Sequence, residues 1–262
     1  MEYLIVLIVG VGAGTLGGII GTGSSLILMP VLVIFFGAQQ AVPMMAIGAM
    51  MGNLGRVITW RKEIDWRACA AYSATAVPAA ILGVHTLLAL SQHTIELALG
   101  IFFISMIPVR RWIASRKIQF SNLHLALIGA PVGFLTGIMV STGPITVPIF
   151  TLYGLERGAF LGTEAAASMM VYFAKVVTFK GMDALPLRLV WQGLIVGAAL
   201  MMGSFIARPI VLKIPSIKFK LMVDLLMLIS GLSSASKLCA AIAAIASKTE
   251  NASRPWCMTT SP

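Results

Sequence analysis

The sequence predicts an all-α protein, a polytopic transmembrane helical bundle of two four-span repeats, each opening with a broken or re-entrant helix. Three observations lead to this prediction. Of the 262 residues, 58% are hydrophobic and only 11% are charged, whereas a soluble domain has about 25% charged residues. The apolar residues form long runs separated by short basic segments. Two of these runs contain a break rich in Gly, Ser and Thr, and the second break recurs one half-chain after the first.

Most of the apolar runs have the length of a single membrane crossing, which takes about 20 residues. These runs lie at about 41–60, 68–90, 94–109, 158–179, 186–207 and 217–246.

The runs at 3–36 and 122–153 are too long for one crossing and too short for two. A continuous helix over either would be about 50 Å long, while the hydrocarbon core is about 30 Å thick. An interruption inside lipid loses backbone hydrogen bonds unless it lines a cavity or binds something. We therefore expect broken or re-entrant helices, with breaks at 21–25 and 141–143.

The two breaks belong to a longer internal repeat. Gly14 and Gly18 recur as Gly133 and Gly137, and the second half has lost one residue near its break. Repeated segments of this length indicate two related structural units. The predicted parts are a first membrane repeat at 1–117, a second membrane repeat at 118–237, and a C-terminal extension and tail at 238–262. Further pairs are Pro30 with Pro148, Ala41 with Ala159, Lys62 with Lys180 and Asp65 with Asp183.

The sequence leaves two orientations of the halves open. Four crossings per half would make the halves parallel, whereas a fifth crossing hidden in each broken run would invert them. In the parallel arrangement the basic loops at 61–67, 110–117 and 180–188 would all be cytoplasmic, as the positive-inside rule requires. The basic segment 208–220 would be an exception. This charge pattern favours the parallel arrangement.

The net charge of +10 comes from the same basic segments between the apolar runs. Because the basic residues cluster between apolar runs, they indicate contact with anionic lipid headgroups and not with nucleic acid. The expected partners are therefore the lipid bilayer and a small anionic substrate. The three cysteines lack metal-ligand spacing, and no Cys or His accompanies the Met pairs. We expect no cofactor and no metal site.

The breaks themselves are candidate binding segments. Ser, Thr and Gly are favoured at helix N-termini, where free N–H groups and the helix dipole attract anions. We expect short helices at 26–36 and 144–153 whose starts meet and bind an anion. The alternative is that small residues only allow close helix packing, and we prefer this for the glycines before each break. The candidate substrate-binding residues are Thr22, Gly23, Ser24, Ser25, Ser141, Thr142 and Gly143.

Polar and charged residues inside the spans are further candidates. Arg56 and Lys175 occupy similar depths in the two halves and would neutralise an anion. Snorkelling to the cytoplasmic headgroups is the alternative for both. Asn53, one turn before Arg56, would donate a hydrogen bond or only pack. Glu164 is a candidate coupling residue, as a proton carrier or an ion-pair partner, unless it lies in the outer interface.

These residues carry a resemblance to a known family. In each half, a Gly-x-x-x-Gly segment opens a glycine-rich pattern that is followed by Pro. This pattern resembles that of the TauE/SafE family of sulfite exporters. The 41–65 stretch is also similar, and the resemblance covers about 10–235. The family typically has three consecutive glycines where this sequence has Gly23-Ser24-Ser25. The resemblance implies transport of sulfite, organosulfonates or related sulfur anions across a bacterial inner membrane.

The function expected from these observations is secondary transport of a small sulfur-containing anion by alternating access. Export is favoured, because an inside-negative potential drives one anion outward by about 2.3 kcal/mol per 100 mV. One alternative is a non-transporting accessory subunit. Another is an intramembrane enzyme, which we do not expect because no His lies near either break and Asp65 and Asp183 fall in loops. The oligomeric state stays open.

Overall fold

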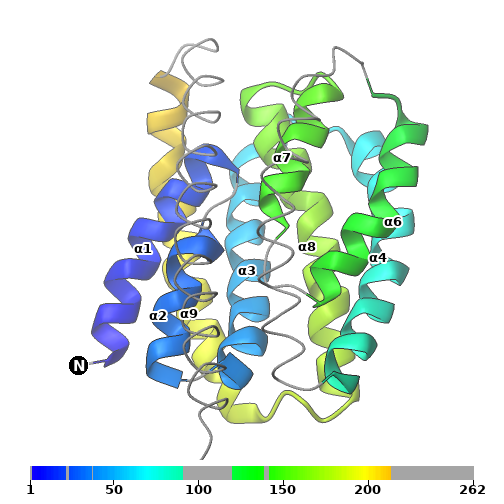
Figure 1. Ribbon diagram of the computed structural model, residues 1–262. Coiled ribbons are helices and arrows are strands. Elements are labelled where there is room, and N and C mark those ends of the chain that lie inside the picture. Colours follow the sequence, from blue (N-terminus) through cyan, green and yellow to red (C-terminus); the bar gives the residue numbers. More distant parts are fainter. Residues whose placement is uncertain (1, 22–23, 37, 91–119, 139–141, 214–262) are drawn as a thin grey trace, which may run out of the picture.

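The structure is a computed structural model that describes residues 2–21, 24–36, 38–90, 120–138 and 142–213. Every regular element in these ranges is a helix, and the helices stand side by side as a bundle (Figure 1). The expected spans at 94–109 and 217–246 and the tail lie outside the described residues. The helices are α1 (Glu2–Ile20), α2 (Ser24–Phe36), α3 (Ala38–Trp60), α4 (Trp66–Ala89), α6 (Asn122–Ile138), α7 (Gly143–Leu152), α8 (Arg157–Gly181) and α9 (Leu187–Lys213).

Four of these helices are long and apolar enough to cross a membrane. They are α3, α4, α8 and α9, and their bounds match four of the apolar runs expected from the sequence. The apolar helices α1 and α6 are somewhat shorter. The prediction of an all-helical, multi-pass bundle is therefore confirmed.

Helix boundaries interrupt both of the long apolar runs. In the first run α1 ends at Ile20 and α2 begins at Ser24, and in the second α6 ends at Ile138 and α7 begins at Gly143. Gly21 closes α1 with its N–H bonded to the Gly17 carbonyl at 2.8 Å. Its φ of +88° suits glycine and few other residues. This backbone conformation ends the helix at Gly21.

The first two helices form an antiparallel pair. Gly10 packs on Ala199 and Gly18 on Ala207, so α1 runs in the same direction as α9. The α3 helix also runs with α9, because Gly48 meets Val196 and Gly55 meets Met201. Since α2 joins the end of α1 to the start of α3, it must return in the opposite direction. We call α1 and α2 the first hairpin.

The α6 and α7 helices form a second hairpin of the same kind. The Phe120 N–H donates to the Leu152 carbonyl at 3.1 Å. The Tyr153 hydroxyl donates to Asn122 Oδ1 at 2.8 Å. The end of α7 therefore lies beside the start of α6.

The two hairpins point in opposite directions (Figure 1). The α8 helix runs against α3, because Gly158 meets Trp60 and Glu164 meets Arg56 farther along. The α7 helix is antiparallel to both α6 and α8, so α6 runs with α8 and against α1. The turns at 61–65 and 182–186 consequently lie at opposite ends of the bundle.

These directions contradict the parallel arrangement favoured by the charge pattern. In that arrangement, loops 61–67 and 180–188 would lie on the same side of the membrane. In the structure the chain reverses direction at each hairpin tip, so each half does not simply cross four times and the two loops lie at opposite ends of the bundle. The directions agree with the inverted alternative. The repeat itself stays a prediction.

Glycines allow the first helix of each hairpin to touch a long helix backbone to backbone. A Cβ at Gly133 or Gly137 would overlap carbonyl oxygens of α4, and one at Gly14 would press on the backbone of Leu200 in α9. Small residues permit such close approach of helices within membranes. The packing role expected for these glycines agrees with their position.

We expect Gly133→Ala to destabilise the protein, because its methyl group would displace the Ala76 backbone in α4. Overpacking of this kind costs about 1–3 kcal/mol. Gly12→Ala is the matched control, since a Cβ there meets nothing within 4 Å. Thermal unfolding of the purified protein in detergent should show a lower melting temperature for Gly133→Ala alone. Equal melting temperatures would contradict the described contact between α4 and α6.

Candidate functional site

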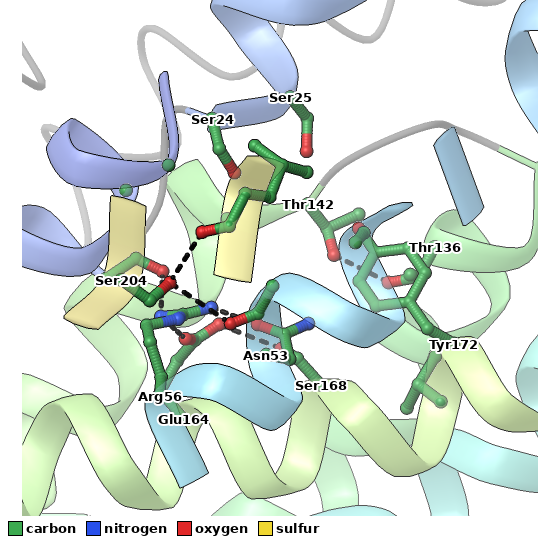
Figure 2. Close-up of a pocket in the computed structure, with 18 of the residues that line it drawn as sticks. Ser24, Ser25, Asn53, Arg56, Thr136, Thr142, Glu164, Ser168, Tyr172 and Ser204 are labelled. Atoms are coloured by element: carbon green, nitrogen blue, oxygen red, sulfur yellow. Dashed lines mark hydrogen bonds and ion pairs between the residues drawn. The ribbon is translucent and has the colours of Figure 1, made fainter. Parts of the chain in front are cut away.

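The tips of the two hairpins line one cavity. Its volume is about 40 Å³, enough for about three water molecules at roughly 10–15 Å³ each. Figure 2 shows Ser24 and Ser25 at the top, Thr142 and Thr136 toward the right, and Arg56 and Glu164 at the lower left. Polar groups from elements far apart in the sequence therefore converge on one small cavity.

An ion pair occupies this site. Arg56 Nη1 on α3 lies 2.7 Å from Glu164 Oε2 on α8, and the two side chains are only 10% and 3% exposed. Buried charges require a partner and hydrogen bonds. The structure therefore identifies Glu164 as an ion-pair partner, one of the roles expected for it.

Arg56 also binds the end of the first hairpin. Its Nη1 donates to the Gly21 carbonyl at 2.5 Å, and its Nη2 donates to Asn53 Oδ1. Carbonyls at the end of a helix have no intrahelical donor. The guanidinium thus satisfies a backbone group that the break would otherwise leave buried without a partner.

Glu164 binds the second hairpin. Its Oε1 accepts hydrogen bonds from Thr146 of α7 at 3.2 Å and from Ser168 of α8 at 2.8 Å. An ionised carboxylate can accept all of these bonds together with that of Arg56. The ion pair and its partners therefore form a continuous polar link from α1 through α3 and α8 to α7.

The starts of α2 and α7 face the cavity. Ser24 and Ser25 line it from α2, and Thr142 and Gly143 line it from the start of α7. The N-terminus of a helix carries free N–H groups and about half a positive charge. Thr142 precedes α7, but its side chain makes no capping hydrogen bond. Its hydroxyl instead lies 2.5 Å from the hydroxyl of Thr136. Thr142 nevertheless occupies the N-cap position, so the helix start expected here is present.

Lys175 lies deep in the bundle, beside the second hairpin. It is 1% exposed, and its Nζ donates to the Thr136 carbonyl at 2.9 Å and lies 5.8 Å from the centre of the Phe179 ring. It is not among the residues that line the cavity. Neither Lys175 nor Arg56 extends to the surface as a snorkelling side chain would. Each donates to a backbone carbonyl near the end of the first helix of the hairpin in its own half.

Most of the residues proposed from the sequence come together. Thr22, Gly23 and Ser141 lie outside the described residues, and Lys175 lies behind the lining. The structure brings together the other candidates, Ser24, Ser25, Asn53, Arg56, Thr142, Gly143 and Glu164.

Sequence reasoning missed several polar residues of the site. Ser168 follows Glu164 by one helical turn on α8, so its spacing could have indicated it. Thr146 lies within the first turn of a helix whose start was expected, so its position near that start could have indicated it. The others give no such signal, because tertiary packing alone brings them to the lining: Tyr72, Thr136, Tyr172 and Ser204.

Comparison with known families supplies an independent result. The family described as Sulfite exporter TauE/SafE matches residues 6–234. The chain belongs to this family. Comparison with curated proteins gives no match, and comparison with solved structures gives none.

Membership fixes the broad class of this TauE/SafE protein. The family is a family of transporters, so the chain is a membrane transporter and not an enzyme. The family and the apolar helices together establish a multi-pass membrane protein. Sulfur-containing anions are the substrate class that membership indicates.

We expect Glu164→Ala to destabilise the protein strongly, because it leaves the buried Arg56 without its carboxylate. Removing one partner of a buried pair costs about 3–5 kcal/mol. The double variant Arg56→Met with Glu164→Met should recover part of the loss, since no unpaired charge remains. Thermal unfolding in detergent measures both effects. Glu63→Ala, which removes an exposed carboxylate, is the control, and a loss as large there would contradict a special role for the pair.

Proposed function

We propose that this protein is a secondary transporter that moves small sulfur-containing anions, such as sulfite or sulfonates, across a bacterial inner membrane. Transport runs by alternating access around the cavity between the two hairpins, and its physiological direction is export. The observation that carries the proposal is the meeting of two helix starts and a buried arginine in one cavity. Cavities of this kind in transporters bind the solute.

The anion is held by the cavity lining. Backbone N–H groups and hydroxyls at Ser24, Ser25, Thr142 and Gly143 donate to its oxygens, and Thr22, Gly23 and Ser141 extend this set. Arg56 provides the main countercharge, and Asn53 positions it through their shared hydrogen bond. Lys175 adds positive potential from behind the second hairpin.

The hairpins are re-entrant segments of two inverted repeats. Their opposite directions, their recurrence in the sequence and their common cavity support this proposal. Transporters with inverted repeats use discontinuous helices to bring N-termini to an anionic substrate. A polar helix break is tolerated inside a membrane protein where it lines such a cavity.

The end of the bundle that carries the α3–α4 turn faces the cytoplasm. Basic residues are enriched in cytoplasmic segments. The opposite end has Lys180 and Arg188 beside its α8–α9 turn. The proposed cytoplasmic end has Arg61, Lys62, Arg67, Arg157, Arg208 and Lys213 among the described residues.

We expect alanine at the hydroxyl-bearing positions of both tips to reduce transport at least tenfold, because each lost donor weakens binding of the anion. Uptake of labelled sulfite into proteoliposomes measures the effect. The variant replaces Ser24, Ser25, Ser141 and Thr142. The control replaces Thr86 and Thr178, whose hydroxyls donate to carbonyls of their own helices. Transport by the four-residue variant at the rate of the control would remove the site assignment.

We expect Lys62→Cys and Asp183→Cys, in a background without native cysteines, to react with a membrane-impermeant thiol reagent from opposite sides. Both positions are exposed in turns at opposite ends of the bundle. The reagent should label position 183 in intact cells and position 62 only in inside-out vesicles. Labelling of both from one side would support the parallel arrangement instead.

A further inference from the structure

We propose that each anion bound in the cavity is accompanied by one proton, which is taken up by Glu164. This inference rests on the proposed function, because it assigns a coupling ion to the same site. It follows from the charge balance of the lining and from the contacts of Arg56.

The guanidinium that should attract the anion is already neutralised. Arg56 Nη1 lies 2.7 Å from Glu164 Oε2, and the guanidinium also donates to Gly21 and Asn53. An anion that binds Arg56 would therefore come within a few ångströms of an ionised, buried carboxylate. Two negative charges so close in a site of low dielectric repel strongly, and the usual outcome is protonation of one of them.

Glu164 is the group that can take this proton. The helices α3, α4 and α7 pack on α8, with lesser contact from α1 and α6. Among the described lining residues, α3 contributes Arg56, α4 contributes Tyr72 and α8 itself adds Tyr172, while α1, α6 and α7 contribute no ionisable side chain. Lys175 lies about three turns farther along α8. Among the described residues that line the cavity, Glu164 is thus the only one with a carboxylate side chain.

The exchange balances in charge and in hydrogen bonds. A proton from water adds to a carboxylate oxygen of Glu164, and Arg56 transfers its Nη1 donation from that group to the anion. The neutral acid keeps a carbonyl oxygen that still accepts from Ser168 and Thr146. For a monoanion, the net charge of the site is the same before and after binding.

The test uses methanesulfonate, an anion whose own charge is constant between pH 6 and 8. Sulfite would not serve, because it takes up a proton itself in this range. Isothermal titration calorimetry in buffers of different ionisation enthalpy counts the protons taken up for each anion bound. For the unmodified protein we expect a count close to one at neutral pH and above, and a dissociation constant that rises up to tenfold per pH unit.

Glu164→Gln is the matched variant, because the amide keeps the size and an accepting oxygen of the carboxyl group without titrating. We expect it to bind methanesulfonate with no proton uptake and with an affinity that does not depend on pH. Asp183→Asn removes an exposed carboxylate at the α8–α9 turn and should behave like the unmodified protein.

The possible failures can be told apart. Binding to the unmodified protein without proton uptake would overturn this inference and leave the proposed function standing. Proton uptake that persists in Glu164→Gln would show that another group is the acceptor, and would also overturn it. Absence of binding by methanesulfonate, thiosulfate and sulfite alike would overturn the proposed function. If Glu164→Gln does not fold, the proton count of the unmodified protein still decides.

Discussion

The contacts of one guanidinium determine how this bundle tolerates two broken helices. Arg56 satisfies the terminal carbonyl of the first hairpin and pairs with Glu164, which in turn binds the second hairpin through Thr146. A helix end buried without such partners would be unstable, because its backbone groups would lose the hydrogen bonds that water supplies elsewhere. The same contacts that stabilise the breaks also put a charge where they meet, so the structural requirement and the chemistry of the site share their residues.

The lengths of the apolar runs and their recurrence allowed the sequence to predict four of the spans and the interruption of both long runs. These features are local, since a run that is too long for one crossing can be recognised without knowing its neighbours. The direction of the halves was not predictable in this way. Loop charges suggested the parallel arrangement, but the return of α2 and α7 reverses the chain inside the bundle. Likewise, nothing local indicates that the Thr142 hydroxyl bonds Thr136 instead of an N–H of α7, or that Tyr72 and Ser204 reach the lining.

A proton carried with the anion would change how the membrane drives transport. An inside-negative potential favours the exit of one net negative charge by about 2.3 kcal/mol per 100 mV. One pH unit on a proton amounts to about 1.4 kcal/mol. For a monoanion the pair is electroneutral, and a proton gradient directed inward would favour entry. A dianion that leaves with one proton still carries one negative charge outward, so the potential outweighs a gradient of one pH unit. Export therefore suits sulfite in its doubly charged form.

The glycine contacts restrict the routes by which an ion can enter. The α6 helix meets α4, and α1 meets α9, with backbone against backbone at Gly133 and Gly14. At these glycines no side chain separates the two backbones. We therefore expect a hydrated ion not to cross the bundle at these positions. Since the long helices close on the hairpins at these contacts, we expect an ion to reach the cavity beside α2 and α7, a helix of only 10 residues.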